Sequence, residues 1–139
     1  MNEIIFQLND KTVEAHEINT LYTLIGWNNS NQRTEDRTVS ILETSAAYAT
    51  ARSGGELIGF GRMLGDAYTA QLLDVMTTPA FRKHGVATQI IQLLLDWSGN
   101  RFLGIYLIDG ARNPTFYERL GFEAADPETD RLMYWQPQL

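Results

Sequence analysis

The chain has 139 residues, of which 44% are hydrophobic and 20% charged, so we expect one globular domain over residues 1–139. It has no cysteine, which excludes disulfides, thiolate metal sites and a cysteine nucleophile and fits a reducing, cytoplasmic location. The formal net charge of -6 argues against general nucleic-acid binding, and no stretch approaches the roughly 20 apolar residues that cross a membrane.

The first third of the chain predicts one strand and two helices. Residues 4–8 (IIFQL) predict a strand. Residues 17–27 predict a helix that ends at Gly26 and whose apolar face carries Ile18, Leu21, Leu24 and Ile25. Residues 28–38 are polar and predict a mobile loop, and residues 39–45 predict a short second helix.

A run of strands follows. Residues 46–52 and 56–64 predict a hairpin that turns at Ser53, Gly54 and Gly55. Residues 70–77 predict a third strand after a turn at Gly65 and Asp66. We expect these strands to pair antiparallel, because the connections are too short for crossovers.

The second half returns to a strand–helix alternation. Residues 86–97 predict an amphipathic helix, and the apolar run 102–109 predicts a buried strand parallel to 70–77. Residues 113–122 predict a helix with Asn113 as N-cap, Pro114 in its first turn and Gly121 just past its end. Residues 131–136 predict a last strand. The fold class is therefore α/β with a mixed sheet, antiparallel at the start and parallel across the centre.

The turn between the third strand of that run and the next helix has the properties of an anion site. The stretch RKHGVAT (82–88) places three basic side chains and a glycine in front of a helix, where unpaired N–H groups carry a partial positive charge. Gly85 permits positive φ and a close approach of a ligand to the backbone. A plain turn with solvated basic residues is the alternative. The stretch matches neither the Walker nor the Rossmann glycine pattern.

These residues resemble a known family. The turn Arg82-x-x-Gly85-x-Ala87, preceded by Thr-x-Pro at 77–79, is similar to the acetyl-coenzyme A signature of the GNAT N-acetyltransferase superfamily. The stretch ELIGFGRMLGD resembles the family's hairpin before the cofactor strand, and NPTFYERLGF resembles its late helix. The resemblance covers roughly residues 17–122 and implies a sheet whose central parallel pair splays apart and is flanked by helices.

The resemblance implies where acetyl-coenzyme A would bind. The pyrophosphate would lie on the backbone N–H groups of the turn, formed by Arg82, Lys83, His84, Gly85, Val86, Ala87 and Thr88. The pantetheine arm would pair with the free edge of the strand end, Val75, Met76 and Thr77, where an N–H of Met76 or Thr77 would polarise the thioester carbonyl. Asn113 and Phe116 match positions that contact the cofactor, although core packing is an equal alternative for Phe116.

The resemblance also suggests how protons would move. Tyr117 matches the family's usual general acid for the departing thiolate, with packing under Leu120 and Phe122 as the alternative. Several family members place a glutamate where this chain has about Gln71, which cannot act as a base. Asp74 is then the only acid in AQLLDVMT, and its role as a base is less favoured than a structural or amine-binding role.

The acceptor side follows from the same resemblance. Trp27 and the polar loop after it match the region that walls the acceptor site, and Tyr48 and Arg62 of the hairpin would line the same cleft; Trp27 is equally interpretable as a core or interface aromatic. We predict a primary amine acceptor, a small molecule or a peptide, with Asp74 and the acidic composition hinting at a cationic one. Neither His16 nor His84 has a partner at metal-ligand spacing, so no metal is expected.

Three functions remain open on the sequence. The first is an N-acetyltransferase that works by direct attack in a ternary complex, because the chain has no cysteine to carry an acyl group. The second is a non-catalytic sensor of coenzyme A or acyl-coenzyme A with the same fold. The third is an assembly protein with an incidental basic turn. The family often forms homodimers, to which the aromatic end MYWQPQL would contribute.

Overall fold

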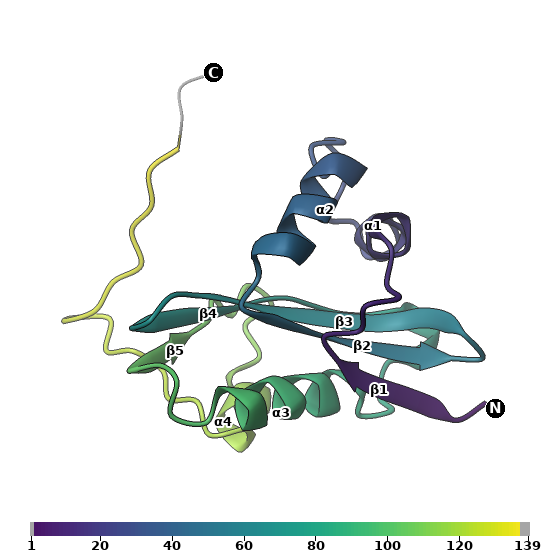
Figure 1. The fold of residues 1–139 in the computed structure, drawn as a ribbon. Helices are drawn as coiled ribbons and strands as arrows, with labels where there is room; N and C mark the ends of the chain where they lie inside the picture. The colour runs from purple at the N-terminus through teal and green to yellow at the C-terminus, as the bar shows by residue number, and fades with distance from the viewer. Residues whose placement is uncertain (1, 137–139) are drawn as a thin grey trace. The chain divides into compact units, whose positions relative to one another are not determined.

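The computed structural model describes residues 2–136 of the chain (Figure 1). The chain divides into two compact units, one up to Leu107 and one from Ile108 onward. Within residues 2–136, no helix combines the length and the apolar character needed to cross a membrane.

The first unit contains a mixed sheet of five strands. The strands follow chain order across the sheet, and they are β1 (Ile4–Leu8), β2 (Ala47–Ser53), β3 (Glu56–Gly65), β4 (Thr69–Thr77) and β5 (Gly104–Tyr106). The pairs β1–β2, β2–β3 and β3–β4 are antiparallel, whereas β4 and β5 are parallel. The predicted mixed sheet is confirmed, because the tight turns allow only hairpins and the helix after β4 supplies a crossover.

Helices cover both faces of this sheet (Figure 1). Helices α1 (Ala15–Leu24) and α2 (Glu35–Thr44) lie on one face, and α3 (Val86–Ser98) lies on the other, after the short 3-10 turn Pro79–Phe81. On the α1 face, the fully buried side chains of Ile18, Leu21 and Tyr22 belong to one cluster with Phe60 and Met76 of the sheet.

Two glycines of β3 let α3 approach the other face closely. A Cβ added at Gly59 or Gly61 would come within 2.7 Å of the side chains of Val86 or Ile90. The side chains of Val86 and Ile90 are both buried. The glycines therefore set how near the start of α3 lies to the sheet, which matters for the turn in front of this helix.

A β-bulge interrupts β4 at Asp74. Phe60 pairs with Met76 and Arg62 pairs with Leu73, so one residue of β3 lies opposite two residues of β4. Asp74 has a φ of 54°, in the left-handed region that few non-glycine residues adopt. Such a bulge bends the strand and redirects a side chain, and here it turns the Asp74 carboxylate toward α1.

The structure corrects two predicted elements of the first unit. The loop predicted over 28–38 ends earlier, because Thr34 caps α2 by accepting the Arg37 N–H at 3.3 Å and the helix begins at Glu35. The strand predicted over 102–109 shortens to Gly104–Tyr106 and is not buried, with Leu103 and Tyr106 85% and 64% exposed. Leu24, predicted on the apolar face of α1, is also exposed.

The second unit contains α4 (Pro114–Arg119) and irregular chain. Asn113 precedes the helix as predicted, but its side chain makes no capping bond; its own N–H instead donates to the Asp109 carboxylate at 2.9 Å. The strand predicted over 131–136 is absent, and the apolar side chains in this segment are exposed. Part of the predicted dimer-forming end, residues 137–139, lies outside the described residues.

Candidate functional site

The turn before α3 leaves the beginning of that helix uncapped. Gly85 is its N-cap residue with a φ of 75°, and it has no side chain to bond the first N–H groups. Within the described chain, the N–H groups of Val86, Ala87 and Thr88 have no protein acceptor, while the Gly85 carbonyl accepts the Gln89 N–H at 3.1 Å. A 13-residue helix thus points three free N–H groups at solvent.

Basic side chains surround this uncapped helix start. Arg82, Lys83 and His84 are exposed, and Lys83 has a φ of 66°. A Cβ at Gly85 would meet nothing within 4 Å, so the position is open to a ligand and requires glycine for its backbone conformation rather than for space within the fold. Free N–H groups with adjacent cations are the donor set that a phosphate needs, and the residues present fit one.

The strand before this turn separates from its parallel neighbour. β4 pairs with β5 only at Thr69, Ala70 and Gln71. Further along, Thr77 pairs with Gly59 of β3 on the other side of β4. Within the described chain, the edge of Val75–Thr77 that faces away from β3 has no strand partner, which leaves backbone groups for an extended ligand. This is where the sequence placed the pantetheine arm.

Asp74 is held by two side chains at the bulge. Its Oδ2 accepts the Arg62 Nε–H at 2.6 Å and the Tyr22 hydroxyl at 3.0 Å. The side chains of Asp74 and Arg62 are only 9% and 14% exposed. Burial, and then the charge of Asp74, raise the pKa of Tyr22, so its hydroxyl keeps its proton and remains a donor. The predicted structural role fits this arrangement better than the role of a free base.

A third cation reaches the same carboxylate from the α1–α2 connection. The guanidinium of Arg33 lies over the Tyr22 ring, 4.3 Å from its centroid, and Nη1 is 3.9 Å from Asp74 Oδ1. Its Nε donates to the carbonyl of Trp27 at 3.1 Å. Trp27 itself is 47% exposed, so it is not a core aromatic. Trp27 and Arg33 line a pocket between the connection and α2, together with Ser30, Gln32, Arg37, Thr38 and Ile41.

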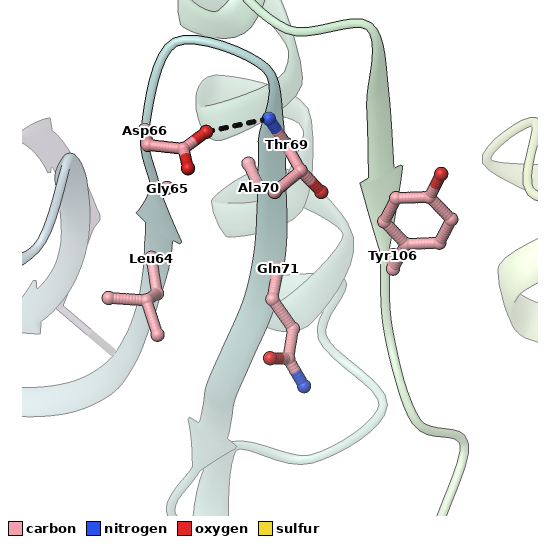
Figure 2. Close-up of a pocket in the computed structure, with 7 residues that line it drawn as sticks. All are labelled: Leu64, Gly65, Asp66, Thr69, Ala70, Gln71 and Tyr106. Carbon is pink, nitrogen blue, oxygen red and sulfur yellow. Dashed lines mark hydrogen bonds between the residues drawn. The ribbon is translucent and has the colours of Figure 1, made fainter. Parts of the chain in front are cut away.

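Gln71 lines a second pocket. This pocket has a volume of about 390 Å³. Figure 2 shows the residues that line it, which are Leu64, Gly65, Asp66, Thr69, Ala70, Gln71 and Tyr106. Leu64, Gln71 and Tyr106 are paired in register across three neighbouring strands, so their side chains share one face of the sheet. The turn beside it is fixed by the Thr69 N–H, which donates to Asp66 at 3.0 Å.

The predicted general acid lies in the second unit. Tyr117 is on α4 and half-buried, between the rings of Phe116 at 5.0 Å and Phe122 at 6.1 Å in edge-on arrangements. Burial and then the charge of Asp109 raise the pKa of the Tyr117 hydroxyl. A phenol whose pKa is raised stays protonated at neutral pH, which is the form that can donate a proton. Phe116 is half-buried and Asn113 exposed.

Tyr48 does not lie where the sequence placed it. It is 7% exposed within the hydrophobic cluster, its ring stacks on Phe60 at 6.1 Å, and its hydroxyl donates to the Asp10 carbonyl. It is therefore a core residue and leaves the candidate site. His16 is exposed and pairs with Glu14 at 2.7 Å. Among residues 2–136, no group of three or more acidic or histidine side chains is placed to hold a metal ion.

The sequence pattern of the Acetyltransferase (GNAT) family matches residues 12–122. The chain belongs to the GNAT acetyltransferase family. A search of curated proteins found no match.

Solved GNAT structures share the fold along nearly the whole chain. A GNAT-family acetyltransferase from Streptococcus pneumoniae TIGR4 is 20% identical with a TM-score of 0.80, covering 99% of this chain and 100% of its own. An acetyltransferase from Trypanosoma brucei is 16% identical with a TM-score of 0.74, covering 97% and 100%. The aminoglycoside N-acetyltransferase AAC(6')-Iy, solved in complex with CoA, is 19% identical with a TM-score of 0.72, covering 100% and 97%. As a GNAT acetyltransferase, this protein is an acyltransferase of a family that uses acetyl-CoA.

The sequence missed three residues that the site contains. Tyr22 and Arg33 both contact Asp74, and Arg37 joins Arg33 at the pocket beside Trp27. Tyr22 lies 52 positions from Asp74, and no local pattern connects them. Thr34 followed by Glu35 and Asp36 is an N-cap signal that would have started α2 earlier and brought Arg37 onto the helix.

Proposed function

We propose that this GNAT protein is an N-acetyltransferase that moves an acetyl group from acetyl-CoA to a primary amine by direct attack in a ternary complex. The observation that carries the proposal is the uncapped start of α3 next to the unpaired end of β4. The two lie close together, because Val86 packs against Gly59 and Gly59 pairs with Thr77.

On the donor side, the N–H groups of residues 83–88 would bind the pyrophosphate, helped by the charges of Arg82 and Lys83, with the side chains of His84 and Thr88 beside them. The Arg82 N–H already donates to the Pro79 carbonyl at 3.3 Å. The backbone of Val75–Thr77 would hold the pantetheine arm, and an N–H of Met76 or Thr77 would stabilise charge on the thioester oxygen. Asn113 and Phe116 are proposed as further contacts of the same co-substrate.

In the reaction, the amine nitrogen would attack the thioester carbon, so that a C–N bond forms and the C–S bond breaks. Tyr117 would give its proton to the departing sulfur. The attacking amine must lose a proton, since alkyl ammonium pKa values lie near 10. We propose that ordered water takes this proton, because Gln71 cannot and Asp74 is occupied by Arg62 and Tyr22.

The same observation favours a second candidate, a sensor that binds coenzyme A without turnover. Gln71 is not a base, and Asp74 is bonded by two donors, so the described β4 offers no free carboxylate to an amine. A sensor would need the phosphate turn and the β4 edge but not a proton donor at Tyr117.

A thiol-release assay with acetyl-CoA and a panel of amines tests the proposal. We expect turnover with at least one amine, and Tyr117→Phe should lower kcat by roughly 100-fold or more, as is typical for the loss of a general acid. Tyr68→Phe is the matched control, because Tyr68 is 69% exposed in the β3–β4 turn. Coenzyme A binding without thiol release from any amine would favour the sensor, and no thermal stabilisation by millimolar coenzyme A would favour an assembly protein.

A further inference from the structure

The pocket beside Trp27 is a distinct cavity on the α1 and α2 side of the sheet. It has a volume of about 330 Å³, which is within the range of small-molecule sites. Its lining comes from the α1–α2 connection and from the first two turns of α2. Trp27 and Ile41 give it an apolar wall, and Ser30, Gln32 and Thr38 give it neutral polar groups.

The charged residues that line this pocket are both arginines. Arg33 is fixed by the carbonyl of Trp27 and the ring of Tyr22. Arg37 has no ion pair with a carboxylate in the described part of the chain. Glu35 and Asp36 share the first turn of α2 with Arg37, but neither of them lines the pocket.

The carboxylate that Arg33 of the pocket approaches is already neutralised. Asp74 accepts bonds from Arg62 and Tyr22, and Arg33 lies 3.9 Å from its other oxygen. An incoming ammonium group would have to displace a guanidinium from a largely buried carboxylate. The sequence suggested Asp74 as the group that attracts a cationic acceptor. In the structure, Asp74 instead pairs with Arg62 and lies close to Arg33.

The loop that carries this pocket is held in place by side-chain bonds. Asn28 accepts the Arg33 N–H at 2.9 Å and donates back to the Arg33 carbonyl at 3.1 Å. Asn19 of α1 donates to the same carbonyl at 3.0 Å. A loop fixed in this way is preorganised, so a ligand does not have to order it.

We propose that this pocket binds the carboxylate of the acceptor, so that the substrate is an amine that also carries a carboxylate, of the size of an amino acid. This inference rests on the proposed N-acetyltransferase function and names its substrate class. Arg37 supplies the free guanidinium, whose planar fork suits a carboxylate. Arg33 connects the pocket to the bulge of β4, because it lines the pocket and reaches Asp74.

A binding experiment tests the pocket without requiring turnover. The full-length protein is titrated with N-acetyl-L-phenylalanine and N-acetyl-L-methionine, and with the amide of each, while the backbone N–H signals of Ser30, Arg37 and Thr38 are followed by NMR. The acid and its amide have the same shape and differ in charge. We expect the acids to shift these signals and the amides to do so at least tenfold more weakly.

Variants of Arg37 test the assignment of the carboxylate. Arg37→Gln should weaken binding of the N-acetyl acids by about tenfold or more, and Arg37→Lys should restore part of it. Arg131→Gln removes one exposed cation from outside the pocket and should change nothing. If the acids leave the signals of Ser30, Arg37 and Thr38 unchanged, or bind as well to Arg37→Gln as to the original protein, the proposal is wrong.

Steady-state kinetics distinguish a failure of the carboxylate proposal from a failure of the proposed transferase function. Phenylalanine, methionine and lysine are compared with their amides, and with cadaverine and kanamycin as polycations. We expect lower KM values for the acids than for the amides, although the amine of an amide is less basic and more readily deprotonated. Arg37→Gln should raise the KM for the acids and leave the KM for acetyl-CoA unchanged. Acetylation of the polycations alone would overturn the carboxylate inference and leave the transferase standing. Carboxylate binding without any acetylation would refute the transferase and leave a carboxylate-binding pocket, but not an acceptor site.

Discussion

The side chain of Asp74 combines an unusual backbone conformation with a full set of partners. Its φ of 54° costs free energy in a non-glycine residue, and the bulge that produces it turns the carboxylate toward Arg62 and Tyr22. The three groups join β3, β4 and α1 at one point. The aspartate neutralises an arginine that is only 14% exposed.

Replacing this aspartate should therefore destabilise the protein more than an ordinary loss of a hydrogen bond. We expect Asp74→Asn to lower the free energy of unfolding by about 3 kcal/mol, since it leaves the Arg62 charge without a counter-ion in a largely buried place. Urea denaturation followed by circular dichroism measures this. Asp130→Asn, at an exposed position with no side-chain hydrogen bond among the described residues, is the control and should have little effect. An equal loss in both variants would contradict the role assigned to the pair.

Helix α3 begins without a side-chain cap. α2 is capped by the side chain of Thr34, whereas Gly85 offers α3 no side-chain acceptor. An uncapped helix start is normally unfavourable, so a ligand that accepts from its N–H groups gains what a cap would have supplied. The glycines of β3 hold this start close to the sheet and to the end of β4.

Gly85→Glu should abolish binding of coenzyme A, because it puts bulk and a negative charge where a phosphate would lie. Isothermal titration with coenzyme A measures the affinity. Gly55→Glu is a matched control: Gly55 has a similar φ of 82°, also has no atom within 4 Å of an added Cβ, and lies in the β2–β3 turn. Unchanged affinity in Gly85→Glu would refute the phosphate turn, and an equal loss in both variants would indicate a general effect of the substitution.

The molecule as a whole carries a formal charge of -6, and much of its stability against acid should come from one buried aspartate. Asp10 follows β1 and is fully buried. Its carboxylate accepts from Thr12, from Thr50 at 2.9 Å and from Arg52 at 3.1 Å, which ties the segment before α1 to β2. Burial alone would raise its pKa, but these bonds outweigh burial and lower it from 3.8 to about 2.

The lowered pKa of Asp10 predicts that the protein loses stability as the pH falls. A pKa lower in the folded state than in the unfolded state stabilises the protein above pH 3.8, and the stabilisation is lost as the pH falls toward about 2. The contribution is about 2 kcal/mol. Asp10→Asn should therefore be less stable than the original protein at pH 6, and the difference should shrink between pH 4 and pH 2 in urea titrations. Asp36→Asn, at an exposed position, should show no such convergence.

Local sequence patterns were sufficient for most elements of the first unit. The antiparallel strands, the amphipathic α3 and the glycine turn before it were predicted close to their observed bounds, because alternation, helical spacing and turn residues act over a few positions. The same stretch also indicated the family, since Arg82, Gly85 and Ala87 stand at fixed spacing. The proposed phosphate site could be predicted from the sequence, because one short segment contains all of its residues.

Contacts between distant residues decided the rest. The run 102–109 is apolar in sequence, yet β5 pairs only with β4 among the described strands, so Leu103 and Tyr106 remain exposed. The family resemblance suggested that Tyr48 lines the acceptor cleft, but its packing against Phe60 puts it in the core. The partners of Asp74 come from α1, β3 and the α1–α2 connection. Alternation along β4 predicts on which face of the sheet the Asp74 carboxylate lies. It does not predict which cations contact that carboxylate, because they come together only when the helices pack on the sheet.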